Sequence, residues 1–249
     1  MPRLGQIRSL IVTAPLIFVA TAVMGSISLL SSLIDSSGNI QHACARTWAL
    51  IVLRVCGVSL TVSGDSQLRL DATYVFCVNH QSHMDIPVLL AALPIPFRFA
   101  AKKELFRIPF LGWHLLRSGH IAIDRRNPHA AVKSFRGASE SLRGGASLAF
   151  FPEGATSLDG TIKPFKAGGF VLAGQSKAAV VPVTICGSRA VLLPKTYHVR
   201  GGRVEVTLGT PIPSGGYSPK ELTTRVREEI VATFENGKTL DRNTHTVSR

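Results

Sequence analysis

The sequence predicts an α/β fold with a mixed, largely parallel sheet flanked by helices. Short apolar runs of strand length alternate along the chain with longer runs of helical periodicity, as expected when helices connect the strands of one sheet. Polar clusters such as Asn79-His80 and Pro152-Glu153-Gly154 come directly after apolar runs. Ligands of open α/β sheets bind beyond the carboxyl ends of the strands, so these clusters indicate where a site would form.

The predicted elements follow one another in a regular order. Strands are expected at the short apolar or β-branched runs, which are residues 74–78, 97–101, 120–123, 147–151, 180–185 and 204–208. Helices are expected at residues 83–93, 110–117, 128–142 with Asn127 as N-cap, 169–176 and 219–234. The last helix is charged and should lie on the surface, and the polar tail from 236 to 249 should be loose.

The amino-terminal segment has no charged residue from Ser9 to Ile34. At about 1.5 Å per helical residue this run is long enough to reach across the hydrocarbon core of a bilayer. A secretory signal peptide is the competing interpretation, but the run is longer than the usual apolar region and no clear small-x-small cleavage site follows it. The segment is therefore a candidate membrane helix.

A second apolar segment, residues 42–62, carries Arg46 and Arg54. An arginine at the bilayer centre costs roughly 2.5 to 3.5 kcal/mol on insertion scales, which disfavours a second full crossing. Because Arg3 and Arg8 hold the amino terminus on the cytoplasmic side, a single crossing would place the rest of the chain outside. We therefore expect a two-helix hairpin over residues 1–62 that dips into one leaflet, a main domain at 63–235 and a tail at 236–249.

Composition and charge agree with a membrane-associated protein. Hydrophobic residues make up 45% of the chain, charged residues only 17%, and the mean hydropathy is +0.24. A formal net charge of +13 favours an anionic partner. Aromatic residues are sparse and no basic helix carries base-reading side chains, so we expect a membrane and no nucleic acid. The four widely spaced cysteines form neither a metal pattern nor a disulfide framework.

The segment NHQSHMD, residues 79–85, follows the first predicted strand of the main domain. A loop that folds back would let Asp85 accept a hydrogen bond from one imidazole nitrogen of His80 and leave the other nitrogen as a base. A purely structural alternative is a capping pair at the start of a helix. No G-x-S-x-G occurs in the sequence, so no serine nucleophile is indicated, and His80 would then activate a hydroxyl of a substrate.

Four ordered blocks extend this pattern: NHQSHMD, GHIAIDR at 119–125, FPEGATS at 151–157 and VPVTICGS at 181–188. Their order and spacing resemble the glycerolipid acyltransferase family, most closely the bacterial 1-acylglycerol-3-phosphate acyltransferases. The resemblance covers roughly residues 73–188. It implies an acyltransferase that uses acyl carrier protein or coenzyme A thioesters and lysophosphatidate. It also implies an enzyme of phospholipid biosynthesis at the inner membrane, with its catalytic domain facing the cytoplasm.

The resemblance also implies roles for individual residues. His80 would be the general base and Asp85 would orient it. Separately from the resemblance, the oxyanion that develops on a thioester carbonyl requires hydrogen-bond donors, and backbone N–H groups at the start of the following helix are candidates. Arg125, Glu153 and Gly154 match the acceptor-binding blocks, with Arg125 on the phosphate and Glu153 holding Arg125 or a glycerol hydroxyl. We expect neither a metal ion nor an organic cofactor.

The third block departs from the family pattern. It usually reads Thr-Arg after Glu-Gly, whereas Ala155-Thr156 stand here, which removes one cation from the expected phosphate pocket. Lys102, Lys103, Lys163 and Lys166 are nearby cations that could replace it, and Lys102 also resembles a lesser family signature. The alternatives are another acceptor, such as glycerol 3-phosphate, a lysophospholipid or a lyso-ornithine lipid, or a non-enzymatic membrane-surface protein.

Overall fold

The computed structural model describes residues 4–124, 138, 142 and 144–246, and it contains one seven-stranded sheet. The strands are β1 (Val58–Ser63), β2 (Tyr74–Val78), β3 (Phe97–Lys102), β4 (Ile121–Ile123), β5 (Ser147–Phe150), β6 (Ala179–Cys186) and β7 (Gly202–Leu208). Their order is β1-β7-β6-β2-β5-β3-β4, and every pair is parallel except β6 and β7. The predicted mixed, largely parallel sheet is therefore confirmed.

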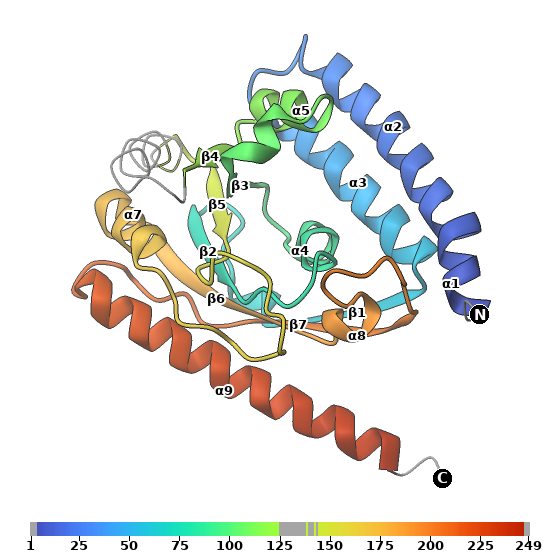
Figure 1. The fold of residues 1–249 in the computed structure, drawn as a ribbon. Helices are drawn as coiled ribbons and strands as arrows, with labels where there is room; N and C mark the ends of the chain where they lie inside the picture. The colour runs from blue at the N-terminus through green and yellow to red at the C-terminus, as the bar shows by residue number, and fades with distance from the viewer. Residues whose placement is uncertain (1–3, 125–137, 139–141, 143, 247–249) are drawn as a thin grey trace.

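Helices cover both faces of this sheet (Figure 1). The helices are α1 (Leu4–Arg8), α2 (Ala14–Ser31), α3 (Asn39–Val55), α4 (Asp85–Ala92), α5 (Leu111–Arg117), α7 (Gly168–Ser176), α8 (Ser188–Val191) and α9 (Pro219–Thr246). A π-helical turn, Ser9–Thr13, joins α1 to α2, and short 3₁₀ turns lie at Asp65–Gln67 and Lys103–Arg107. The predicted helix at 128–142 lies largely outside the described residues.

Strand β2 shows how the sheet divides two cores. Its residues are all buried, and alternate side chains point to opposite faces. Phe76 and Val78 join the cluster under α3 and α4, whereas Val75 and Cys77 join the cluster under α7 and α9. A strand that is buried on both faces reads as a continuous apolar run, which explains why this strand was predicted with its correct bounds.

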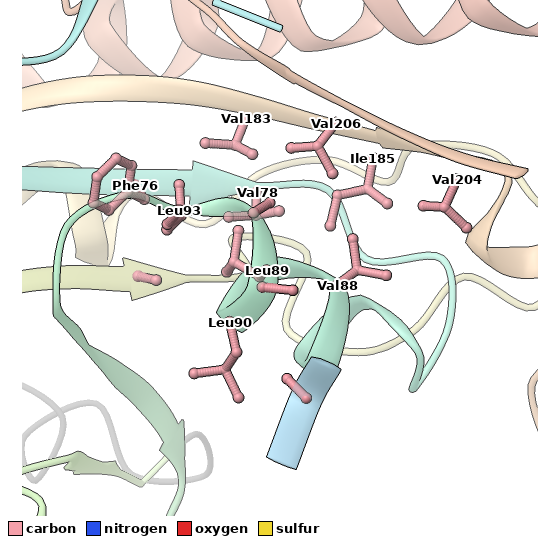
Figure 2. Packing of buried hydrophobic residues seen from close by; sticks show 14 of the residues in the cluster. Phe76, Val78, Val88, Leu89, Leu90, Leu93, Val183, Ile185, Val204 and Val206 are labelled. Carbon is pink, nitrogen blue, oxygen red and sulfur yellow. The ribbon is translucent and has the colours of Figure 1, made fainter. Parts of the chain in front are cut away.

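Helix α4 packs against one face of the sheet and begins directly after the polar loop that follows β2. Figure 2 shows its Val88 and Leu89 between the helix and the strands that carry Val78, Ile185 and Val204. All five side chains are fully buried. At about 25 cal/mol per Å² of buried apolar surface, each such side chain contributes roughly 1.5 to 3 kcal/mol. The start of α4 is thus held firmly against the sheet.

The structure corrects the predicted extent of the amino-terminal hairpin. Residues 58–62 were expected in its second apolar segment, but Val58–Ser63 forms β1 and pairs in parallel with β7. Gly57, with φ +67°, ends the connection from α3, and the alternating β-branched residues suit an edge strand. The sheet therefore begins inside the segment that we had assigned to the hairpin.

The two amino-terminal helices lie side by side, with α2 on the outside of α3 (Figure 1). Within the described residues, only Gly5–Ser31 is long and apolar enough to cross a membrane, with a hydropathy of 2.2. Helix α3 buries Ala49, Val52 and Leu53 in the main core. A hairpin with both helices in the bilayer therefore stays a prediction.

The carboxyl-terminal helix is longer than predicted. We expected it to end at Phe234 before a loose tail, but α9 continues to Thr246. Leu222, Val226, Ile230 and Phe234 bury one stripe of the helix against the sheet. Once these turns are anchored, adding further turns costs little, because helix propagation fixes one residue for each hydrogen bond gained.

Candidate active site

The loop between β2 and α4 is fixed to the next strand by Asn79. Its side-chain amide donates to the Ile185 carbonyl at 2.9 Å, and its side-chain oxygen accepts from the Ile185 N–H at 2.7 Å. Asn79 is completely buried, so these bonds replace the water that its amide would otherwise need. The loop that follows therefore leaves the sheet in a defined direction.

The structure brings His80 and Asp85 together. The Nδ1 atom of His80 lies 2.9 Å from Oδ2 of Asp85. The same oxygen accepts from the N–H groups of Gln81 at 2.7 Å and Ser82 at 2.9 Å. Since a carboxylate only accepts, Nδ1 carries the hydrogen and the Nε2 lone pair is left as a base. Asp85 opens α4, where the helix dipole also favours a negative charge.

Phe151 holds the ring of His80 from the side. The two rings stack with centroids 4.0 Å apart and an interplanar angle of 18°. The His80 side chain keeps 12% of its surface exposed, while the Asp85 side chain is fully buried. The imidazole is therefore locked in orientation and still reachable from outside. Phe151 begins the FPEGATS block, but nothing in the sequence indicates that its ring contacts His80.

Glu153 links the loop that carries His80 to the segment that carries Lys163 through two hydrogen bonds, and we call this link the Glu153 clasp. Its Oε1 accepts from the His80 N–H at 2.7 Å, and its Oε2 accepts from the Lys163 N–H at 2.9 Å. Burial raises the pKa of this carboxyl, and the two backbone hydrogen bonds act in the opposite direction. We expected Glu153 to hold Arg125 or a glycerol hydroxyl. In the structure its two oxygens accept from backbone N–H groups. Arg125 lies outside the described residues, so the expected contact stays a prediction.

The segment after Glu153 wraps around the same loop. The Ser157 N–H donates to the His80 carbonyl at 2.9 Å. The Arg189 guanidinium donates to the carbonyls of Ser157 and Leu158 at 2.8 and 2.6 Å. Arg189 was missed because nothing in the local sequence pairs it with a loop about thirty residues earlier. The result is a backbone frame around His80 that is fixed on both sides.

Two lysines place their ammonium groups on this frame. Lys163 Nζ lies 3.5 Å from the carbonyl of Thr156, the residue that departs from the family pattern. Gly154 has φ +79°, and a Cβ there would lie 3.0 Å from Lys166 Nζ. A side chain at residue 154 would therefore be strained and would crowd Lys166. Gly154 thus allows the close approach of Lys166, and close approach of an acceptor to this backbone stays a prediction.

The remaining predicted cations lie farther along the sheet. Lys102 ends β3, which is separated from β2 by β5 and is thus about 10 Å from it. Its side chain is 46% exposed, with Nζ 3.8 Å from Glu104 Oε2. Lys103 Nζ pairs with Asp124, which directly precedes Arg125. Arg125 itself lies outside the described residues.

Four of the N–H groups near the start of α4, where we expected an oxyanion to be stabilised, already have acceptors in the structure. Those of Gln81 and Ser82 donate to Asp85, and that of Met84 donates to the Ser82 hydroxyl at 3.1 Å. The Asp85 N–H donates to the Ser82 carbonyl at 3.2 Å. These four groups serve to shape the loop, so they do not form an oxyanion hole. His83, which lies between them, is exposed.

Comparison with known proteins identifies the family. The family model described as Acyltransferase matches residues 59–186, which is just over half of the chain. The chain belongs to this acyltransferase family. A 1-acyl-sn-glycerol-3-phosphate acyltransferase of Saccharomyces cerevisiae is 30% identical over 214 residues, covering 84% of this chain and 70% of the yeast protein. The family assignment agrees with the resemblance that the four sequence blocks indicated.

Other members of the family cover different shares of their own length. The chloroplastic enzyme LPAT1 of Arabidopsis thaliana is 34% identical over 78% of this chain but only 54% of its own, so this chain spans about half of that relative. A relative from Borreliella burgdorferi is 27% identical over 80% of this chain and 79% of its own. The crystal structure of the 1-acyl-sn-glycerophosphate acyltransferase PlsC from Thermotoga maritima has a TM-score of 0.81 at 26% identity. That match covers 94% of this chain and 98% of the other.

Proposed function

We propose that this protein transfers a fatty acyl group from acyl carrier protein or coenzyme A to the sn-2 hydroxyl of 1-acylglycerol 3-phosphate, which yields phosphatidate. The observation that carries the proposal is the imidazole of His80, with Nδ1 held by buried Asp85 and an edge left exposed. Several family members carry the name 1-acyl-sn-glycerol-3-phosphate acyltransferase. An alcohol needs such a base, since a positioned general base contributes about 10²- to 10⁴-fold in rate.

The proposed step is a direct transfer. As the lipid hydroxyl oxygen forms a bond to the thioester carbonyl carbon, Nε2 of His80 takes the hydroxyl proton. The tetrahedral intermediate then breaks its C–S bond, and His80 returns the proton to the departing sulfur. Asp85 stays ionised and stabilises the imidazolium that forms between these events. No enzyme nucleophile and no cofactor take part.

The acceptor's phosphate is proposed to bind near the lysines of the Glu153 clasp. Glu153 links the His80 N–H to the Lys163 N–H through its two oxygens, which keeps the Lys163 backbone close to the base. Lys163 Nζ approaches the Thr156 carbonyl, and Lys166 Nζ approaches Gly154. These two ammonium groups are positioned to serve where the family pattern has an arginine, with Lys102 as a further cation. Arg125, which lies outside the described residues, keeps the acceptor-binding role that its sequence block implies.

We further propose that the apolar helix lies in the membrane surface and does not cross the bilayer. Near its start, Ser9 Oγ and the Val199 backbone hydrogen-bond at 3.2 Å. Near its end, Ser28 Oγ lies 2.7 Å from His114 Nδ1. These contacts are about 28 Å apart along the helix, close to the thickness of a hydrocarbon core. One polar domain cannot occupy both sides of a bilayer, so both helix ends belong on the same, cytoplasmic, side of the inner membrane.

His80→Ala tests the catalytic proposal, and His83→Ala is its matched control. His83 is exposed and lies in the same loop. Purified protein in vesicles would be given a labelled thioester and lysophosphatidate. We expect His80→Ala to lose at least about 10²-fold in rate and His83→Ala to stay near wild type. Equal losses in both variants, or fatty acid release without an acceptor, would contradict transfer by His80.

The Ala155-Thr156 departure favours a second candidate, transfer to a different acceptor. A panel of lysophosphatidate, glycerol 3-phosphate, a neutral lysophospholipid and lyso-ornithine lipid would decide between them. If lysophosphatidate is the acceptor, Lys163→Ala should raise KM for phosphate-bearing acceptors, whereas Lys220→Ala, a surface control on α9, should not. A preference for an acceptor without a terminal phosphate would overturn the first candidate.

A further inference from the structure

Helix α5 and the turn before it carry a row of large apolar side chains that face outward. Phe110, Trp113 and Leu116 are 64%, 52% and 61% exposed. They recur every three residues, and the opposite side of the helix, with Gly112 and Leu115, is buried. A Cβ on Gly112 would lie only 2.2 Å from the Phe106 carbonyl oxygen, so the inner side is packed tightly. The outward row is therefore fixed in direction.

Phe110 is held outward by an unusual backbone. Its φ of +63° lies in a region that residues with a side chain rarely adopt. Its ring leans against Trp113, with centroids 5.3 Å apart. Folding that ring inward would have removed apolar surface from water, yet the chain adopts a disfavoured conformation and leaves the ring exposed. Such conformations concentrate at functional sites, which indicates that the exposed ring has a partner.

The row is continuous with the apolar helix α2. An open hollow of about 420 Å³ lies between them, lined by Leu29, Ser32, Leu33, Trp113, Leu116 and Arg117. The hydrogen bond between Ser28 and His114 locks the two helices together at this point. Leu30 in the last turn of α2, and Leu33 and Ile34 in the turn that follows it, are 66%, 75% and 84% exposed. Exposed apolar side chains therefore continue from α2 to α5, two helices that contact each other in the structure. Figure 1 shows the position of the two ribbons.

Two exposed arginines flank this row, Arg107 before it and Arg117 at its end. We propose that Phe110, Trp113 and Leu116, with these arginines, form a second membrane contact. We call it the α5 surface. It inserts at the headgroup level of a bilayer that contains anionic phospholipid. Indole and phenyl rings favour this depth, and arginines there meet lipid phosphates. The proposal rests on the proposed placement of α2 in the membrane surface.

A bilayer fits this surface better than a second copy of the chain. Two copies that met through the α5 surface would bring their flanking arginines together, and each copy carries a formal net charge of +13. Like charges across an interface oppose association, whereas an anionic bilayer neutralises them. Exposed apolar surface beside clustered cations is the pattern of a membrane-surface element.

The α5 surface would control how the domain is oriented on the membrane. A single helix that lies in a bilayer surface can roll about its own axis and lift the domain by different amounts. A second contact, beside that axis, removes this freedom. Because α5 follows β3 and its terminal Lys102, the same contact sets the height of the catalytic edge above the lipid. Acceptors would then enter from the bilayer without leaving it.

Tryptophan fluorescence tests this proposal directly, because the chain has two tryptophans, Trp48 and Trp113. In a Trp48→Phe variant, Trp113 is the only source of indole emission. With vesicles of equal parts phosphatidylcholine and phosphatidylglycerol, we expect a blue shift, protection from iodide and quenching by brominated lipid. Emission that stays unchanged while the protein sediments with the vesicles would overturn the proposal. Self-association through the α5 surface would also overturn it. In that case Trp113 would be protected from iodide without any lipid, and the molecular mass of the protein would rise with its concentration.

A double variant, Phe110→Ser with Trp113→Ser, tests the functional consequence. Its control is Leu70→Ser, which removes a side chain that is 71% exposed in the turn before β2. We expect the double variant to bind anionic vesicles at least about tenfold more weakly than the control. Acyl transfer to a vesicle-embedded acceptor should fall along with vesicle binding, while acyl transfer to a water-soluble short-chain acceptor stays unchanged.

His80→Ala, in contrast, should lose both activities. The two proposals can therefore fail independently of each other. Equal vesicle binding by the double variant and its control would overturn the α5 surface.

Discussion

Two regions of the molecule hold their polar groups in different ways. One is the catalytic edge, which we define as the loops around His80 and Glu153. The other is the seam, which we define as the contact of α2 and α3 with the domain around Arg98 and Leu93. At the catalytic edge, the buried carboxylates of Asp85 and Glu153 accept from backbone N–H groups. At the seam, Arg98 donates to the Ser37 carbonyl at 2.6 Å, and Arg46 donates to the Leu93 carbonyl at 3.0 Å. Arg189 and Lys163 also reach carbonyls at the catalytic edge, but the buried charges that fix the His80 loop there are carboxylates. At the seam the corresponding charges are guanidiniums that donate to carbonyls.

This difference decides what a histidine can do in each region. At the seam, burial lowers the pKa of His42 to about 4, with Arg98 and Arg46 adding to the effect. Burial also lowers the pKa of His114 and holds that of His120 well below its usual value. His120 stays neutral and accepts from the Phe99 N–H at 2.7 Å. Among the histidines that the structure describes, the one that contacts a carboxylate is His80, at the catalytic edge, through Asp85.

The largest effect should come from removing that carboxylate's charge. Asp85→Asn keeps the shape of the side chain but no longer requires Nδ1 to carry the hydrogen, so Nε2 is not reliably free as a base. We expect kcat to fall by about 10²- to 10⁴-fold. Steady-state rates with lysophosphatidate measure this, and Asp71→Asn, at an exposed ion pair with Arg69, is the control. Near-normal kcat in Asp85→Asn would remove the distinction between the two regions.

A smaller effect is expected at the clasp. Glu153→Gln replaces one of two acceptors with a donor that faces a backbone N–H. Hydrogen bonds to charged groups contribute about 1.5 to 3 kcal/mol, so the free energy of unfolding should fall by about that amount. We expect kcat to fall less than in Asp85→Asn, because the base itself remains. Urea unfolding and steady-state kinetics measure the two effects. If the acceptor KM rose and stability stayed unchanged, Glu153 would contact the acceptor and would not position the loop.

The parts of the catalytic edge that were predictable are local in sequence. The Asp85 carboxylate contacts His80 within a single loop that carries both residues. Strand β2 is recognisable in the sequence because it is an unbroken apolar run. The partners of Glu153 were not predictable, because the carboxylate could equally have met a side chain or a substrate. Phe151 was missed for a similar reason, since only the folded sheet places it against the His80 ring.

The seam was less predictable because its contacts join distant parts of the chain. Val58 begins β1 by pairing with Gly202, and its apolar neighbours look continuous with the preceding helix. In the sequence, Arg46 is a charge that disfavours a second full crossing of the bilayer, but in the structure its guanidinium donates to the Leu93 carbonyl inside the domain. A periodic pattern reports which residues share a face, and it does not report whether that face meets lipid, water or another helix.

Acid should weaken the seam through its histidines. The unfolded chain binds a proton at His42 below about pH 6.5, whereas the folded chain binds one only below about pH 4. Between these values the unfolded state holds more protons, so stability decreases as the pH falls. The loss from His42 should be about 2 kcal/mol at about pH 5, and His114 and His120 add to it. Thermal unfolding in detergent at about pH 7.5 and 5 should show this.

The side chain in His42→Gln cannot titrate. The loss of unfolding free energy between about pH 7.5 and 5 should therefore be smaller in this variant by about the 2 kcal/mol that His42 contributes. The control is His83→Ala, since His83 is exposed at the catalytic edge and away from the seam's cations. An unchanged pH dependence in His42→Gln would mean that His42 binds its proton equally well in both states. The seam would then be no more sensitive to acid than the rest of the molecule.

The smallest effect concerns the contact between α2 and α5. Ser28→Ala removes a hydroxyl 2.7 Å from His114 Nδ1, a hydrogen bond that contributes about 1 kcal/mol. Ser118 Oγ lies 3.3 Å from the same nitrogen and can take its place, so the single variant should lose less than that. The double variant Ser28→Ala with Ser118→Ala should lose more than the sum of the two single losses, by about 0.5 kcal/mol or more.

The control is Thr21→Ala, which removes the acceptor of Trp48 Nε1. Thr21 shares no partner with Ser118, so the losses in stability from Thr21→Ala and Ser118→Ala should add. Additive losses in the Ser28 and Ser118 pair would show that His114 does not exchange partners, and the seam would then depend on each hydrogen bond separately.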